Sequence, residues 1–403
     1  MLPRTPWNVI FMACLPLLAD IPMPAKTSFA RGVPRRFPQK NERFHGWSAS
    51  FRRSRPGHRA GSEQEARPLL ESPGVPPLAF RYQTRLSPSD AADYDEFVAR
   101  ARGGAWAQLR DFAPLATADR PFAPSFFLAR DAGRVVASAL VLRGRFAGLP
   151  MPWAQIERGP VVDSPDDLAR VLPWLRRALL RRGILRLQIM PYFDGADAEE
   201  VERVLRSQGF RLTQAMDGAH ARTLRMSLEG ARDEDVLSGS VRKTLRYELK
   251  QASKAGVRVR RLRGPEVSLF GALHRETMGG QGKSGKAERF IEELGRATLN
   301  SEAIAVFHAG DSEPLGAVVL ARCGARATLV LGATASARRP FSKMAPPLVE
   351  GLSWARSAGC TQLDLGGIPA PEDTDPKRRA IAAFKLGFTR DCVSLVREHA
   401  RWL

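Results

Sequence analysis

Two stretches of the chain, far apart in sequence, share the same pattern of apolar runs around a short turn. Phe126–Gly133 leads into the apolar run Val135–Leu142, and Ala305–Gly310 leads into Leu315–Leu320. Apolar and β-branched runs around a turn that contains Gly and Asp predict a β-hairpin at each place. The second hairpin follows the first at an offset of 178 residues, counted from Leu142 to Leu320.

The segments around the two hairpins repeat at nearly the same offset. Helical and strand periodicity predict these pairs: helices 97–102 and 270–277, helices 168–180 and 344–358, strands 184–189 and 361–365, and helices that end at Gly209 and Gly387. The repeat favours a duplicated α+β fold with the order helix–hairpin–helix–strand–helix–strand. We expect one domain over residues 80–230 and a second over 231–403, with the last strand free to return to the first domain.

The first 80 residues have a different composition. They carry 12 basic and 5 acidic side chains, and they are rich in Pro, Arg and Ser. Such a segment buries too little apolar surface to offset its ordering entropy, so we predict a disordered leader over residues 1–79. The apolar stretch Trp7–Leu18 within it is either a weak signal peptide, or part of a leader without function or of a misassigned start, and we favour the leader or misassigned start over the signal peptide.

Composition limits the chemistry. The 403 residues carry a formal charge of +20, of which +13 lies after residue 80, so the folded part is itself basic and suited to polyanions. No apolar run reaches the length of a membrane span. The four cysteines lack CxxC spacing and the six histidines lack ligand spacing, so we predict no metal, no cofactor and a reducing cytoplasmic location.

A basic helix is predicted over residues 240–255, between the two repeats. Its apolar positions form one stripe, and its cations form a second stripe beside the first: Val241, Leu245, Leu249 and Ala252, then Arg242, Arg246, Lys250 and Lys254, with Lys243 and Tyr247 adjacent. Ser240 is the expected N-cap and Gly256 the expected stop. The basic stripe is either a solvated face or a phosphate-binding surface, and the sequence leaves both alternatives open.

These residues resemble a known family. The segments Arg242–Tyr247 (RKTLRY) and Ala252–Val257 (ASKAGV) are similar to the basic helix of the Fem (FemX/FemAB) enzymes. Asp364–Ile368 (DLGGI) followed by Ala383–Phe388 (AFKLGF) is similar to that family's glycine and Phe-Lys signature. Weaker matches lie at 105–109, 158–161 and 331–333. The loop 369–377 departs from the family pattern.

The resemblance implies a fold of two GNAT-like acyltransferase halves and a tRNA-dependent aminoacyltransferase that builds peptidoglycan bridges. It implies that Phe384 and Lys385 contact the aminoacyl end of the tRNA, with the lysine stabilising charge near the ester. Gly366 and Gly367 would let a substrate approach the backbone, although they equally suit a tight turn. The other substrate-binding candidates are Arg242, Lys243, Arg246, Tyr247, Lys250 and Trp106.

The implied partners are an aminoacyl-tRNA and a UDP-linked or lipid-linked muropeptide, with peripheral contact at the inner membrane face and a monomeric state. Two rival functions stay open. One is an ordinary GNAT acyltransferase that uses acyl-CoA, which is disfavoured because the loop Ala335–Lys343 lacks glycine and contains Pro340. The other is a non-catalytic protein that binds RNA or an envelope precursor.

Overall fold

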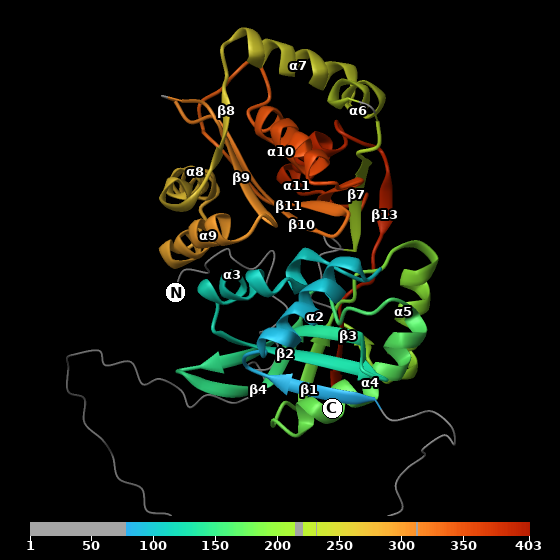
Figure 1. The fold of residues 1–403 in the computed structure, drawn as a ribbon. Coiled ribbons are helices and arrows are strands. Elements are labelled where there is room, and N and C mark those ends of the chain that lie inside the picture. The colour runs from blue at the N-terminus through green and yellow to red at the C-terminus, as the bar shows by residue number, and fades with distance from the viewer. Residues whose placement is uncertain (1–77, 214–220, 231, 312) are drawn as a thin grey trace, which may run out of the picture. The chain divides into compact units, whose positions relative to one another are not determined.

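The computed structural model describes residues 78–213, 221–230, 232–311 and 313–403. The expected leader, apart from its last two residues, and the apolar stretch Trp7–Leu18 lie outside the described part. Within that part the chain forms two seven-stranded sheets with helices packed against them (Figure 1). None of the described helices is both long enough and apolar enough to span a membrane.

The first sheet is mixed, with β4 and β5 parallel and all other neighbours antiparallel. In spatial order its strands are β1 (Ala79–Gln83), β2 (Phe122–Asp131), β3 (Arg134–Phe146), β4 (Leu149–Ile156), β5 (Arg186–Ile189), β14 (His399–Trp402) and β6 (Arg211–Leu212). Its helices are α2 (Pro88–Arg100), α3 (Ala113–Ala118), α4 (Pro165–Leu180) and α5 (Gly195–Ser207), with short 3₁₀ turns at Trp106–Gln108 and Arg110–Phe112.

The second sheet repeats this arrangement, with β11 and β12 as its parallel pair. In spatial order its strands are β13 (Cys392–Ser394), β7 (Arg222–Ser227), β12 (Gln362–Gly367), β11 (Arg326–Thr334), β10 (Gly316–Cys323), β9 (Ile304–Ala309) and β8 (Val259–Leu262). Its helices are α6 (Asp233–Ser240), α7 (Lys243–Lys254), α8 (Ser268–Gly279), α9 (Glu288–Asn300), α10 (Ala345–Ser357) and α11 (Pro376–Lys385), with a 3₁₀ turn at Gly264–Val267.

The predicted repeat is confirmed. The hairpins are β2–β3 and β9–β10, and the predicted helices and strands of the two crossovers are α4 and α10, β5 and β12. In each half a third strand, β4 or β11, follows the hairpin. A crossover helix then returns the chain so that the next strand runs parallel to that third strand, as a β–α–β connection requires.

The two sheets exchange strands at the ends of the repeat. β7 precedes residue 230, where the sequence pattern placed the domain boundary, yet it pairs with β12 and β13 of the second sheet. β14 follows the second repeat and pairs with β5 and β6 of the first sheet. The chain therefore crosses between the sheets twice, once before β7 and once before β14.

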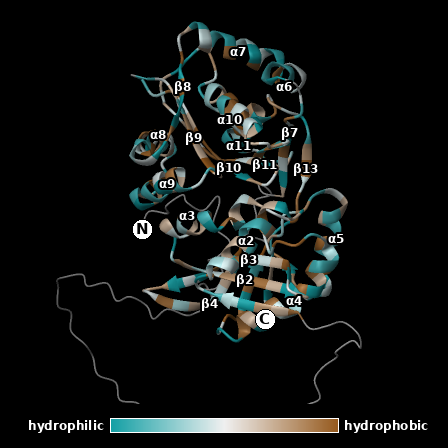
Figure 2. Cartoon of the chain, viewed as in Figure 1, coloured by the Kyte–Doolittle hydropathy of each residue, from teal (hydrophilic) through white to brown (hydrophobic). Residues whose placement is uncertain are grey.

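Each crossover helix buries one apolar face against its sheet. In α4 the buried positions Leu168, Leu172, Leu175 and Leu179 recur at helical spacing. In α10 a Cβ on Gly351 would lie 2.6 Å from Leu320 Cδ1, so only glycine permits this close approach of helix and sheet. Figure 2 shows β9 mainly in brown and α7 largely in teal, in keeping with their buried and exposed positions.

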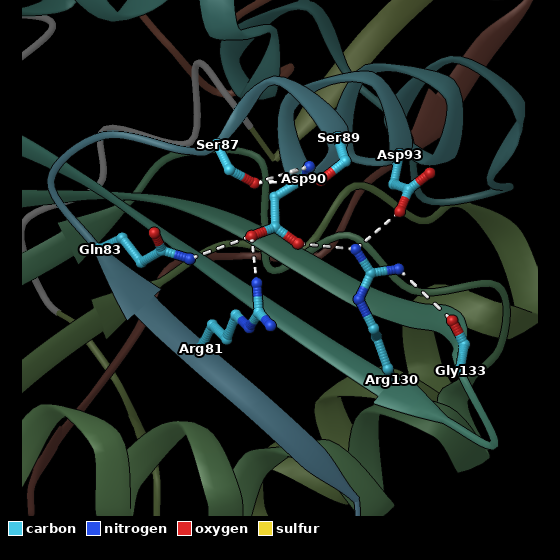
Figure 3. A network of polar contacts seen from close by, with 8 residues as sticks. All are labelled: Arg81, Gln83, Ser87, Ser89, Asp90, Asp93, Arg130 and Gly133. Atoms are coloured by element: carbon cyan, nitrogen blue, oxygen red, sulfur yellow. Dashed lines mark hydrogen bonds and ion pairs between the residues drawn. The ribbon is translucent and has the colours of Figure 1, made fainter.

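A buried carboxylate fastens the edge of the first sheet to α2 (Figure 3). Asp90 accepts hydrogen bonds from Arg130 Nη2 at 2.8 Å, Arg81 Nη1 at 2.7 Å and Gln83 Nε2 at 3.2 Å. The bond from Arg130, together with the other donors, holds the pKa of this carboxyl well below its usual range. β1, β2 and α2 are thus joined by one ionised group.

Candidate functional site

The end of β12 forms a turn around a buried carboxylate. Asp364 is 3% exposed, and its Oδ1 accepts a hydrogen bond from the backbone N of Gly366 at 2.7 Å. Gly366 has a φ of +78°, a conformation that side chains other than glycine rarely adopt. The hydroxyls of Tyr192 and Thr223 also donate to Asp364. The carboxylate therefore fixes the shape of the turn at Gly366 and Gly367.

Lys385 lies against this turn. α11 begins at Pro376, where the Asp375 side chain caps the helix by accepting from two backbone N–H groups, and it ends at Lys385. Lys385 Nζ donates to the carbonyl oxygen of Gly367 at 2.8 Å. The structure thus brings together Lys385, Gly366 and Gly367, three of the predicted site residues.

The ammonium group of Lys385 is poorly solvated although the residue as a whole is only half-buried. Burial lowers the pKa of Lys385 from 10.5 to about 8, and the negative charge of Asp364 opposes this shift. Lys385 is therefore cationic at neutral pH, in surroundings where poor solvation raises the free energy of the charged form. Perturbed groups of this kind are typical of functional sites.

Tyr192, which follows β5 of the first half, is held among three arginines. The guanidinium carbons of Arg326, Arg158 and Arg225 lie 4.6, 5.3 and 5.8 Å from the centre of its ring. Burial and the charge of Asp364 raise the pKa of Tyr192 to about 12, while the arginines oppose the shift. The phenol stays protonated at neutral pH, so it acts as a hydrogen-bond donor to Asp364.

Sequence reasoning did not select Tyr192, Thr223, Arg225 or Asp364 as site residues. Asp364 stood within the DLGGI motif, and Arg158 stood within another matched segment, so both were visible without an assigned role. A general signal existed for Tyr192, because it follows the C-terminal end of a parallel strand, where sites in α/β sheets gather.

The basic helix differs from its prediction at the start. The helical region is split into α6 and α7, and Ser240 is the last residue of α6 while Arg242 occupies the N-cap position of α7. The expected N-cap at Ser240 is therefore wrong, because the chain takes an extended conformation at Val241 before it enters α7. The expected stop is confirmed, since Gly256 has a φ of +71° directly after the C-cap.

The two predicted stripes on α7 are present. Leu245 and Ala252 are buried, and Leu249 packs on the core of the second half. The cationic and polar candidates lie at exposed or half-buried positions: Arg242, Lys243, Arg246, Tyr247 and Lys250. Glu248 is the one acidic residue of α7, and its carboxylate accepts a hydrogen bond from the backbone N of Ser342 at 2.9 Å.

The start of α7 touches the segment that follows Lys385. The backbone N of Arg242 donates to the carbonyl oxygen of Gly387 at 2.9 Å. A Cβ on Gly387 would lie 3.1 Å from Leu245 and 3.2 Å from Arg242 Nε. The start of the basic stripe therefore lies next to the chain that directly follows Lys385.

Two other candidates lie in the core. The ring of Phe384 packs edge-on against Phe388, with 5.4 Å between ring centres, and joins the core of the second half. The ring of Trp106 packs edge-on against Phe112 at 4.4 Å. The preceding residue, Ala105, packs in a cluster with Tyr192. The ring of Trp106 instead packs against the separate cluster that contains Phe112.

The loop before α10 is held by carboxylates of α7 and α8 and by its own Lys343. The backbone N of Ser336 donates to Glu276 at 2.7 Å, and Lys343 Nζ donates to the carbonyl oxygen of Ala337 at 2.8 Å. With the Glu248–Ser342 bond, two carboxylates occupy amides that a phosphate would need at this loop. No group of three or more His, Cys, Asp or Glu side chains in the described ranges is arranged to hold a metal ion.

The chain is similar to known protein families along most of its described length. The model of the FemAB family matches residues 90–297, and the model of the acetyltransferase (GNAT) domain matches residues 239–378. No curated protein sequence matches the chain.

Solved structures share the fold at low identity. A crystal structure of FemX is 16% identical with a TM-score of 0.68, and the match covers 80% of this chain and 97% of that one. A tandem GNAT protein from the clavulanic acid biosynthesis pathway is 12% identical with a TM-score of 0.50, covering 81% and 98%. L-PGS from Bacillus licheniformis is 14% identical with a TM-score of 0.51, covering 78% and 91%. The predicted fold of two GNAT-like halves is confirmed.

Proposed function

The chain belongs to the FemAB family, and we propose that it transfers an aminoacyl group from an aminoacyl-tRNA to an amine of a peptidoglycan precursor peptide. The family and the GNAT-like fold support an acyltransferase. The choice of aminoacyl-tRNA as donor and of a precursor peptide as acceptor is our proposal. It is supported by the basic stripe of α7 and by the Phe384-Lys385 pair beside the glycine turn.

The single observation that carries the proposal is the position of Lys385. Its ammonium group has three donor hydrogens. Among the described residues it makes one hydrogen bond, to the carbonyl oxygen of Gly367. In our proposal another hydrogen is donated to the carbonyl oxygen of the ester. As the acceptor amine attacks, negative charge grows on that oxygen, and a desolvated cation stabilises it strongly.

This chemistry needs no covalent enzyme intermediate, because an ester is already activated for attack by an amine. The amine forms the new C–N bond and leaves an oxyanion on the former carbonyl oxygen. The oxyanion collapses to the amide as the C–O bond to the ribose breaks, and the proton that the amine loses goes to the departing ribose oxygen. The task of the protein is to place two anionic substrates together and to stabilise charge. Gly366 and Gly367 would admit the ester to the backbone, and Phe384 would lie by the aminoacyl end.

For the acceptor we propose the basic stripe of α7. Arg242, Lys243, Arg246, Tyr247 and Lys250 would bind the diphosphate and sugar of a UDP-linked or lipid-linked precursor, because several cations on one helix face suit phosphates. The contact between Arg242 and Gly387 supports this assignment, since it places the stripe beside the Lys385 turn. Trp106 remains a predicted contact of the substrate.

The experiment is transfer in vitro from a pool of labelled aminoacyl-tRNAs to UDP-linked and lipid-linked muropeptides, read by mass spectrometry. Lys385→Ala should abolish transfer and keep the fold. Arg379→Ala, which removes an exposed cation from the same helix, is the matched control and should leave transfer unchanged. Normal turnover by Lys385→Ala would remove the assignment. Tight binding of CoA by calorimetry would instead favour an acyl-CoA enzyme.

A further inference from the structure

The β3–β4 hairpin ends in two exposed apolar side chains. Phe146 and Leu149 are 69% and 68% exposed, and they pair across the two strands. The turn between them, Ala147–Gly148, has positive φ at both positions, +48° and +82°, as in the tight turns of two-residue hairpins. The turn therefore fixes both side chains in the exposed position, since they flank it directly.

Two other segments lie beside the base of this hairpin. The backbone N of Leu185, in the loop after α4, donates to Pro152 O at 2.7 Å, and the backbone N of Leu403 donates to Leu185 O at 2.7 Å. These segments add three exposed apolar side chains: Leu180, Leu185 and Trp402, which are 41%, 47% and 60% exposed. Together with Phe146 and Leu149 they form the apolar part of what we call the basic edge.

The charged part of the basic edge consists of arginines alone. There is no Asp or Glu in residues 132–156 or 168–193. Eight arginines of these segments form no ion pair with a carboxylate of the described chain: Arg134, Arg143, Arg145, Arg176, Arg177, Arg181, Arg182 and Arg186. Arg134 begins β3, at the opposite end of that strand from Phe146, and the other seven belong to the basic edge. Arginines on other parts of the described surface do have acidic partners, such as Arg130 with Asp90 and Arg261 with Glu302.

The arginines are also close to one another. Arg143 and Arg182 both act on the Tyr82 hydroxyl, whose pKa is raised by burial and lowered by their charge. Burial and the charge of Arg401 lower the pKa of Arg176. Like charges gathered without counter-ions are unfavourable in the free protein, so the basic edge is suited to an anionic surface.

The apolar side chains decide between two anionic surfaces. Nucleic acid would offer phosphates for the arginines, but it stacks its bases on planar groups. Phe146 and Trp402 are planar, whereas the other three of the five exposed apolar side chains are leucines. A bilayer offers anionic headgroups and an apolar layer below them, and it suits basic segments mixed with Leu, Phe and Trp. The leader is itself basic, so it does not complement the arginines.

We propose that the basic edge docks on the surface of a bilayer that contains anionic phospholipids, with Phe146 and Leu149 inserted among the headgroups. Docking leaves the candidate site open, because β5 begins at the basic edge with Arg186 and runs away from it toward Tyr192. The surface would hold the enzyme at a membrane, where a lipid-linked acceptor is found. The membrane contact itself does not depend on the proposed transfer reaction.

The test is co-sedimentation of the full chain with vesicles of phosphatidylcholine, with and without phosphatidylglycerol. The wild type should bind only the anionic vesicles. A basic residue near such a surface contributes about 1 kcal/mol, or about fivefold in affinity. Arg181→Glu with Arg182→Glu should therefore weaken binding by at least about tenfold, and Phe146→Ser with Leu149→Ser should weaken it at every salt concentration.

Matched controls lie elsewhere on the surface. Arg134→Glu with Arg289→Glu reverses two exposed arginines away from the basic edge, and Leu299→Ser removes an apolar side chain that is 61% exposed on α9. Both should bind vesicles nearly as the wild type does. Equal losses in the control and basic-edge variants would overturn the proposal. The proposal would also be overturned if the wild type bound no vesicles but bound RNA, and if Arg181→Glu/Arg182→Glu weakened that RNA binding. The basic edge would then be an RNA-binding surface.

A second measurement separates this proposal from the transfer function. Lys385→Ala should bind vesicles as the wild type does. Phe146→Ser/Leu149→Ser should retain its activity on a soluble UDP-linked acceptor. Vesicle binding without any transfer would remove the proposed function and leave the docking surface standing, while transfer without vesicle binding would do the reverse.

Discussion

Replacing Lys385 by methionine should make the folded protein more stable at neutral pH. The substitution keeps the length of an unbranched side chain and removes a charge from a place that disfavours it. Most substitutions of half-buried residues destabilise a protein, so the expected sign is unusual. It follows only if Lys385 is held in a costly state, as functional residues often are.

The magnitude follows from the pKa of Lys385. A decrease from 10.5 to about 8 corresponds to about 3 kcal/mol of folding free energy at pH 7. The residue is half-buried, so solvent screening reduces the free energy that is gained by removing the charge. Loss of the hydrogen bond to Gly367 takes away about 1 kcal/mol of the remaining gain. The expected net gain is about 1 kcal/mol.

The gain should depend on pH in a defined direction. Between pH 8 and 10.5 the unfolded lysine keeps its proton while the folded lysine loses it, so the stability of the wild type rises with pH there. The advantage of Lys385→Met is therefore complete below pH 8 and fades above it. The Nζ–Gly367 bond is lost in the variant at every pH, so it does not produce this trend.

Urea unfolding at pH 7 and pH 10, followed by circular dichroism, measures the effect. Arg379→Met on the exposed side of the same helix is the control and should show no gain. A loss of stability in Lys385→Met at pH 7, or a difference that stays constant with pH, would refute the reasoning. The lysine would then be an ordinary solvated residue.

The remaining predictions concern other groups. Asp364→Asn should lower the pKa of Lys385 further, because the charge of Asp364 raises it, and the alkaline limb of the pH–rate profile should move to lower pH. Gly366→Ala should reduce transfer at least about tenfold and also lower the melting temperature, since alanine is strained at a φ of +78°. Arg246→Ala should raise the KM for the UDP-linked acceptor and reduce its salt dependence, with the KM for tRNA unchanged, in initial-rate assays. Asp90→Asn should lower the urea midpoint at pH 7, and this loss should shrink as pH falls below about 4, because the folded pKa of Asp90 is depressed and the wild type loses that stability in acid.

Much of the fold was predictable because its signals are local. Alternating apolar runs mark the hairpins, and glycine marks the ends of the helices, so β2–β3, β9–β10, α4 and α10 follow from short windows of sequence. The strand exchange was only partly foreseen, since the sequence pattern left the last strand free to return to the first domain but placed β7 in the first half. β14 has only four residues, and its pairing with β5 depends on a contact between residues about two hundred positions apart.

The break between α6 and α7 shows a further limit. The stripe of apolar positions starts at Val241 and suggests one helix from residue 240. The structure ends α6 at Ser240 and restarts at Lys243, since Ser238, Gly239 and Ser240 are weak helix formers. Periodicity locates the buried face of a helix more reliably than its first residue.

The candidate site was predictable only in part. Lys385, Gly366 and Gly367 came from a resemblance between short segments, and the structure does place them in contact. The partners of Asp364 had no such signal. Tyr192 and Thr223 lie 172 and 141 positions away in sequence, and nothing in their own segments indicates a hydrogen bond to a distant aspartate.

A duplicated fold need not carry two sites, and the repeat suggests why the candidate lysine lies in the second half. At the offset of 178 residues, the counterpart of Lys385 in the first half is Ser207, whose hydroxyl donates to Val204 O of its own helix at 2.8 Å. That position serves the end of a helix and offers no cation. The first half instead supplies Tyr192 from the end of β5, which binds Asp364 at the corresponding strand of the second half. Tyr192, after β5, thus supports Asp364 in β12. A substitution at either residue should therefore change the pKa of Lys385, because the charge of Asp364 acts on that lysine.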